Sequence, residues 1–113
     1  MDGKYIRQFK KGALELVLLG LLQEGEAYGY QLICQLDRRG GAIFGGAREG
    51  TIYPVLYRLE EAGLIRSRLA AEGGRERKYY ALTDQGQTAL GELKAFWQDF
   101  THCVNGFLEE ERQ

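Results

Sequence analysis

The chain has 113 residues, an apolar fraction of 44% and a formal net charge of −1 at pH 7. These values are ordinary for one globular domain, with or without an appended element. The longest apolar stretch, residues 13–22, contains Glu15 and is too short to span a bilayer. The first residues lack the layout of a signal peptide. We therefore expect a cytoplasmic protein with no membrane partner.

The charges are unevenly distributed along the chain. Residues 1–78 hold 13 of the 15 lysines and arginines against 10 acidic residues, a net charge of +3. Residues 79–113 hold 2 basic residues against 6 acidic ones, a net charge of −4. A basic front part permits a local cationic face even though the whole chain is almost neutral.

The first part of the chain predicts helices. Residues 1–11 alternate aromatic and basic residues, which indicates a short amphipathic lead-in helix. Residues 13–23 are apolar on nearly all sides, which is typical of a helix at the centre of a core. Residues 28–39 form a second amphipathic helix, which Gly40 and Gly41 end.

A glycine-rich segment follows, with glycines at 40, 41, 45, 46 and 50. A phosphate-binding P-loop would need Gly-Lys-Ser/Thr at its end, and no lysine is present. We interpret the segment as a flexible connector that Phe44 anchors to the core.

Residues 49–66 predict a third helix, which starts with Gly50 and Thr51 as turn and cap residues and ends at Gly63. One side carries apolar residues at helical spacing, namely Ile52, Val55, Leu56 and Leu59. The other side carries groups suited to contact a partner, namely Tyr53, Pro54, Tyr57 and Arg58. Taken singly, each tyrosine fits a half-buried surface aromatic equally well.

Two strand-like runs, residues 64–69 and 75–82, flank a Gly-Gly turn and predict a β-hairpin. Strand alternation places Tyr79 and Tyr80 on opposite faces. The basic residues near the tip are Arg75, Arg77 and Lys78.

A long helix is expected from Thr83-Asp84 onward. Its apolar residues recur at steps of three and four, the spacing of a heptad seam, at Leu90, Leu93, Trp97, Phe100, Val104 and Phe107. We expect this seam to pack on a second copy of the chain, because large exposed aromatics at the end of a monomer are a liability. The alternative is that the helix packs back on its own domain.

This order of elements is that of a winged helix-turn-helix, a mainly α fold with a small β-hairpin (α+β). We expect a DNA-binding domain over residues 1–82 and a dimerisation helix over residues 83–113. The third helix then enters the major groove of DNA and the hairpin is the wing. Thr51 is placed to contact a phosphate, and Arg58 to contact guanine or a phosphate. The basic wing tip suits phosphates, which fix position more than they read sequence.

Residues 50–65, Gly-Thr-Ile-Tyr-Pro-Val-Leu-Tyr-Arg-Leu-Glu-Glu-Ala-Gly-Leu-Ile, resemble the signature of the PadR family of bacterial transcriptional regulators. Residues 74–86 are similar to that family's wing and hinge, and residues 16–22 and 28–32 to its first two helices. The resemblance implies a homodimeric repressor that binds a palindromic operator and releases it on binding an inducer. It also adds Tyr28 to the expected DNA contacts. The glycine-rich connector and Arg48-Glu49 depart from the pattern.

The single C-terminal helix resembles the compact branch of the family, some of whose members bind planar aromatic compounds between the subunits through a tryptophan. The resemblance implies an effector site at Trp97, with Phe96 and Phe100. The alternative is that Trp97 is an ordinary residue of the seam, whose spacing it also fits.

Two other classes of function compete with DNA binding. A winged-helix module that binds a protein instead of DNA is favoured slightly by the balanced net charge. An enzyme lacks support, because His102 is the only histidine and its neighbour Cys103 points away from it. Cys34 and Cys103 are expected to pack as small reduced hydrophobic residues. We expect no metal ion and no cofactor.

Overall fold

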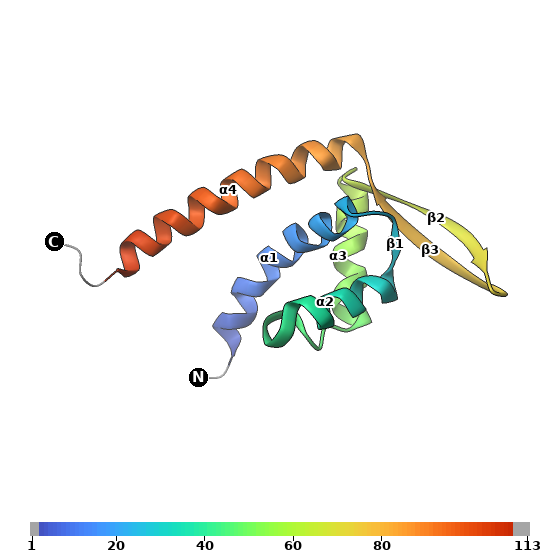
Figure 1. Ribbon diagram of the computed structural model, residues 1–113, viewed down its shortest axis with the longest axis horizontal. Coiled ribbons are helices and arrows are strands. Elements are labelled where there is room, and N and C mark those ends of the chain that lie inside the picture. Colours follow the sequence, from blue (N-terminus) through green and yellow to red (C-terminus); the bar gives the residue numbers. More distant parts are fainter. Residues whose placement is uncertain (1–2, 110–113) are drawn as a thin grey trace.

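Residues 3–109, the part of the chain that this computed structural model describes, form four helices and a small antiparallel sheet (Figure 1). The ends of the predicted segments 1–11 and 83–113 lie outside this part. The elements follow the expected order of three helices, a hairpin and a last helix, so the α+β fold is confirmed. They are α1 (Lys4–Gln23), β1 (Ala27–Tyr28), α2 (Gly29–Phe44), α3 (Glu49–Glu61), β2 (Ile65–Glu72), β3 (Arg75–Leu82) and α4 (Asp84–Leu108).

The helix α1 is continuous, so the prediction of a separate lead-in helix was wrong. Gly12 does not interrupt it, because a single glycine lowers helix stability without preventing the helical conformation. The second half of α1 lies in the core, where Leu18 and Leu19 are fully buried. The first half carries exposed apolar residues, of which Phe9 is 80% exposed.

The helix α2 extends further than the sequence indicated. Its backbone leaves the helical conformation at Gly41, where φ is 54° and ψ is −134°, and one more turn follows to Phe44. Phe44 packs against the core as expected. The connector to α3 is therefore short, and Asp37 holds it by accepting a hydrogen bond of 2.8 Å from the Gly46 amide.

The predicted hairpin is present, and a short strand adds to it. β2 and β3 pair antiparallel around Gly73 and Gly74, whose φ values of 58° and 79° suit the tight turn. β1 pairs with the other edge of β3, placing Tyr28 opposite Tyr79. The strand order is β1-β3-β2. No sequence pattern predicted β1, because two residues are too few to show an alternating pattern.

The helix α4 begins within the core and then leaves the domain (Figure 1). Thr83 caps its first turn by accepting a hydrogen bond from the Gly86 amide. Leu90 is buried in the core of its own chain, so its placement in the predicted dimer seam was wrong. The rest of the seam is at least 37% exposed: Leu93, Trp97, Phe100, Val104 and Phe107.

Both cysteines are exposed and free, so the prediction that they pack as small hydrophobic residues was wrong. Across residues 3–109, the structure contains no helix long and apolar enough to cross a membrane. The same residues hold no cluster of three or more histidine, cysteine or acidic side chains arranged for a metal ion.

Candidate nucleic-acid interface

The helix α3 is fixed by one apolar side, and this determines what its other sides present. Ile52, Val55, Leu56 and Leu59 are buried in the core. The helix begins at Glu49, and Arg48 occupies the N-cap without a side-chain hydrogen bond, so the prediction of a cap at Gly50-Thr51 was wrong. Thr51 lies within the first turn, and its amide bonds the Arg48 carbonyl at 2.9 Å.

The outward side of α3 carries Tyr57, whose side chain is 65% exposed. Pro54 lies one turn earlier and is also exposed. Pro54 lies inside the helix, beyond its first turn, and has no amide hydrogen to donate to the carbonyl four residues earlier. Tyr57 is therefore more accessible than Tyr53, the other tyrosine of this helix.

One flank of α3 faces α1. Arg58 points to this flank and forms an ion pair with Glu15 of α1 at 3.1 Å. Thr51 lines the same flank. Pro54 lines this flank as well, so the flank adjoins the outward side that carries Tyr57.

The opposite flank of α3 faces α2. Tyr53 lies here, 39% exposed, with its ring against Gly29 at the start of α2. The sequence grouped Tyr53 with Tyr57, but only Tyr57 projects freely.

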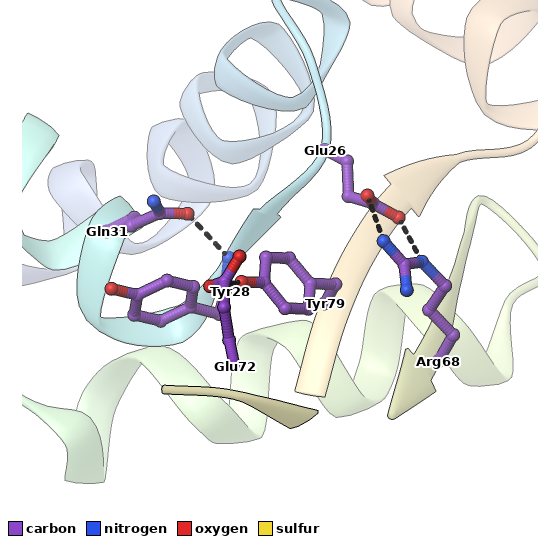
Figure 2. A network of polar contacts seen from close by, with 6 residues as sticks. All are labelled: Glu26, Tyr28, Gln31, Arg68, Glu72 and Tyr79. Carbon is purple, nitrogen blue, oxygen red and sulfur yellow. Dashed lines mark hydrogen bonds and ion pairs between the residues drawn. The ribbon is translucent and has the colours of Figure 1, made fainter. Parts of the chain in front are cut away.

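The start of α2 meets the wing through an aromatic pair (Figure 2). The rings of Tyr28 and Tyr79 lie edge to face, with centroids 5.4 Å apart. The guanidinium of Arg77 lies over the Tyr28 ring at 4.3 Å, a cation–π distance. The Tyr28 amide donates to Gln31 Oε1 at 3.1 Å, which satisfies an amide at the helix start.

An ion pair fastens the wing beside this aromatic pair (Figure 2). Arg68 of β2 donates two hydrogen bonds to the Glu26 carboxylate, at 2.6 and 2.7 Å. This hydrogen bonding lowers the pKa of Glu26 below its ordinary value. The Tyr79 hydroxyl donates to Glu72, and this bond is the main reason that the pKa of Tyr79 is raised. The sequence did not single out Glu26 and Arg68, which are 42 residues apart, because no local pattern links them.

The basic residues of the wing do not share one environment. Arg75 and Lys78 are exposed, whereas Arg77 is half-buried over Tyr28. Arg75 and Arg77 border a hollow of about 430 Å³ with Tyr28 and with Glu49 at the start of α3. The structure thus brings Arg75 and Arg77, the start of α2 and the start of α3 together along one edge.

A second hollow lies between α1 and α4 and is mainly apolar. It has a volume of about 440 Å³ and includes Phe9, Leu16, Phe96, Trp97 and Phe100 among its lining residues. The rings of Phe96 and Phe100 are stacked, with centroids 5.5 Å apart, and Trp97 is 6.4 Å from Phe100. The three predicted effector residues are therefore neighbours on one helix face.

A family model of PadR-like transcriptional regulators matches residues 18–92, which run from the middle of α1 through the wing into α4. The chain belongs to the PadR family. Its members are transcriptional regulators and not enzymes, in agreement with the sequence analysis. The match ends before Trp97, so it says nothing about the hollow between α1 and α4.

Individual PadR-like proteins resemble the chain over most of its length. The transcriptional regulator Rv3488 of Mycobacterium tuberculosis is 36% identical over 101 residues, which are 89% of this chain and 91% of that protein. The negative transcriptional regulator PadR of Bacillus subtilis is 37% identical over 68% of this chain, which is 42% of its own length.

Solved structures of PadR-family regulators have the same fold. A PadR family transcriptional regulator from Eggerthella lenta superposes with a TM-score of 0.83 at 34% identity, covering 95% of this chain and 91% of that one. A PadR-like regulator from Bacillus cereus gives a TM-score of 0.78 at 38% identity, covering 91% and 98%. Both matches cover more of the chain than residues 18–92, which the family model matches.

Proposed function

We propose that this PadR-family regulator binds double-stranded DNA with the outward side of α3 in the major groove. The observation that carries the proposal is Tyr57, which projects from the middle of a helix whose opposite side is buried. A helix so held matches the way recognition helices are presented to a groove. Arg75 and Arg77 of the wing border a hollow with Tyr28 and with Glu49 at the start of α3, and they offer cations to the DNA backbone.

The proposed contacts differ by position. Tyr57 and Pro54 face the bases and suit thymine methyl groups and sugars, and the Tyr57 hydroxyl suits a base edge. Arg75 and Lys78 are exposed and suit phosphates of the flanking backbone. Tyr28 and Arg77 contact each other, so they present one joined surface.

The remaining candidates lie on the flanks of α3. Tyr53 touches DNA only with the part of its ring that Gly29 leaves open. Thr51 and Arg58 approach the phosphates on the α1 side, and Arg58 must exchange Glu15 for a phosphate to do so.

A mobility-shift assay with the promoter DNA that flanks the gene tests this proposal. We expect specific binding that weakens steeply as salt rises, since phosphate contacts release counterions. Tyr57→Ala should weaken binding by roughly tenfold, the effect of losing one good base contact. Ile43→Ala, which removes an apolar side chain that is 59% exposed from the end of α2, is the control. Binding that Tyr57→Ala leaves unchanged would contradict the assignment of α3.

The wing supplies a separate test, which also addresses the alternative of a protein-binding module. The double variant Arg75→Gln/Lys78→Gln should weaken binding to all DNA sequences alike and reduce the dependence of the affinity on salt concentration. Arg38→Gln/Lys94→Gln removes the same charge from exposed positions of α2 and α4. A wild-type chain that retains no DNA at low salt, but still binds a protein partner, would favour the alternative.

We also propose that two copies associate through α4, so that residues 1–82 form the DNA-binding unit and residues 83–113 the dimerisation helix. Support comes from the row of exposed apolar side chains on α4 and from the exposed Tyr5, Ile6 and Phe9 of α1. A two-fold dimer presents α3 twice and predicts a palindromic operator. Sedimentation should show a dimer, and Phe100→Glu should shift it toward monomers. A monomer at high concentration would contradict this proposal.

We further propose that the regulator is a repressor released by a planar aromatic effector near Trp97. The hollow between α1 and α4 is lined by Phe96, Trp97 and Phe100, which suit stacking on a flat ring. A panel of planar aromatic compounds should quench Trp97, the only tryptophan, and release DNA. No quenching across the panel would rule out the aromatic effector site and would not affect the proposal that the protein binds DNA.

A further inference from the structure

A different hollow, of about 540 Å³, lies between α1 and α3. It borders the face of α1 that is opposite to the aromatic hollow at Trp97. Its volume lies within the range of about 300–1,000 Å³ that is usual for small-molecule sites. Its mouth carries four cations, Arg7, Lys10, Lys11 and Arg58. The hollow is also lined by Thr51 and Pro54, so it adjoins the side of α3 that is proposed to read DNA, whereas no residue of the wing lines it.

The charges at this hollow are largely uncompensated. Within residues 3–109, Glu15 pairs with Arg58, whereas no carboxylate forms an ion pair with Arg7, Lys10 or Lys11. Asp37 is near the wall, but its carboxylate accepts the Gly46 amide. Like charges held close together repel one another, so an anion at the mouth would relieve them.

The interior of the hollow is apolar. Leu14 and Val55 are 7% and 4% exposed and belong to the core, and Phe44 packs against them from the end of α2. A phosphate group alone would leave this apolar surface unused. A ligand with an anionic head and an apolar body satisfies both parts of the site.

We propose that the hollow between α1 and α3 binds an amphipathic organic anion, such as a carboxylate that bears a short alkyl chain or one ring. The head lies among Arg7, Lys10 and Lys11, and the body lies on Leu14 and Val55. The site is separate from the aromatic hollow at Trp97 and does not depend on DNA binding.

Titration of the full-length protein with octanoate, followed by amide NMR without DNA, tests the proposal. We expect saturable shifts at Gly46 and Thr51, which line the hollow. Acetate lacks the body and 1-octanol lacks the charge, so each should bind much more weakly. Octanol that binds as well as octanoate, or shifts confined to Trp97 and its neighbours, would overturn the site.

Charge variants complete the test. The double variant Lys10→Gln/Lys11→Gln should weaken octanoate binding roughly tenfold or more, because hydrogen bonds to charged groups are stronger than those between neutral groups. The exposed pair Arg38→Gln/Lys94→Gln removes the same charge elsewhere and should leave the affinity unchanged. Equal losses in both variants would overturn the proposal. So would a result in which a DNA duplex or inorganic phosphate shifts Gly46 and Thr51 and octanoate does not, since the cations would then serve phosphates.

Discussion

The ring of Tyr53 on α3 lies directly against Gly29, the first residue of α2. A methyl group at position 29 would overlap the outer atoms of the ring. The glycine therefore sets how closely the ring of one helix approaches the backbone of the other. It also fixes Tyr53 on the flank of α3 and away from Tyr57.

We expect Gly29→Ala to move the Tyr53 ring and to lower the free energy of unfolding by about 1 kcal/mol, as in modest overpacking. The loss is small because the overlap is with the end of a side chain that can rotate. Urea denaturation measures it, with Gly20→Ala, which meets open space, as the control. In a double-mutant cycle with Tyr53→Ala the two effects should not add. Strict additivity would mean that the contact does not contribute.

A glycine at the start of α4 behaves differently, because its neighbour is backbone. A methyl group at Gly86 would overlap the carbonyl oxygen of Leu64, which also accepts the Thr83 amide at 3.1 Å. Gly86→Ala should therefore lower the free energy of unfolding by about 3 kcal/mol or prevent folding. Gly91→Ala, at an open position of the same helix, should be neutral or stabilising by about 0.5–1 kcal/mol. Thermal unfolding of the two variants should separate them clearly, and similar midpoints would contradict the contact.

The side chain of Thr83 joins α4 to the turn before β2. Its hydroxyl accepts the Gly86 amide at 3.0 Å and donates to the Gly63 carbonyl at 2.7 Å. Thr83→Ala removes both bonds and should lower the free energy of unfolding by about 1–2 kcal/mol. Thr83→Ser keeps the hydroxyl and should recover most of the lost free energy of unfolding, as measured by urea titration. A serine variant as unstable as the alanine variant would show that the methyl group matters more than the bonds.

The ion pair between Glu26 and Arg68 predicts a pH dependence. Hydrogen bonding to Arg68 lowers the pKa of Glu26 below the ordinary value of 4.5. The pair therefore stabilises the folded chain above that value, and its contribution is lost as the pH falls through the lowered pKa. The unfolding midpoint of Glu26→Gln should lie slightly below that of the wild type at neutral pH and converge with it in acid. The effect is small because both groups are exposed.

The matching control for this pH series is Glu92→Gln, an exposed acid on α4. Its midpoint should follow the wild type at every pH. If the gap between Glu26→Gln and the wild type stayed constant into acid, the carboxylate charge would not be its source.

Local patterns in the sequence predicted the elements that depend on neighbours in the chain. Helical spacing located α3 and α4, and the Gly-Gly turn located the hairpin, because these signals lie within a few residues of each other. The same patterns failed where a long-range partner decides the outcome. A two-residue strand such as β1 exists only because β3 offers it an edge. Helix α1 continues through Gly12, although the sequence pattern divided this region into two helices.

The candidate site divides in the same way. The sequence by itself determined that Tyr53, Tyr57 and Arg58 leave the buried side of α3, since spacing along one helix fixes this. Only the tertiary structure decided their separate surroundings, with Tyr53 on Gly29, Arg58 on Glu15 and Tyr57 exposed. The physical reason is that periodicity reports directions around a helix axis, whereas contacts depend on which distant segments pack on each flank.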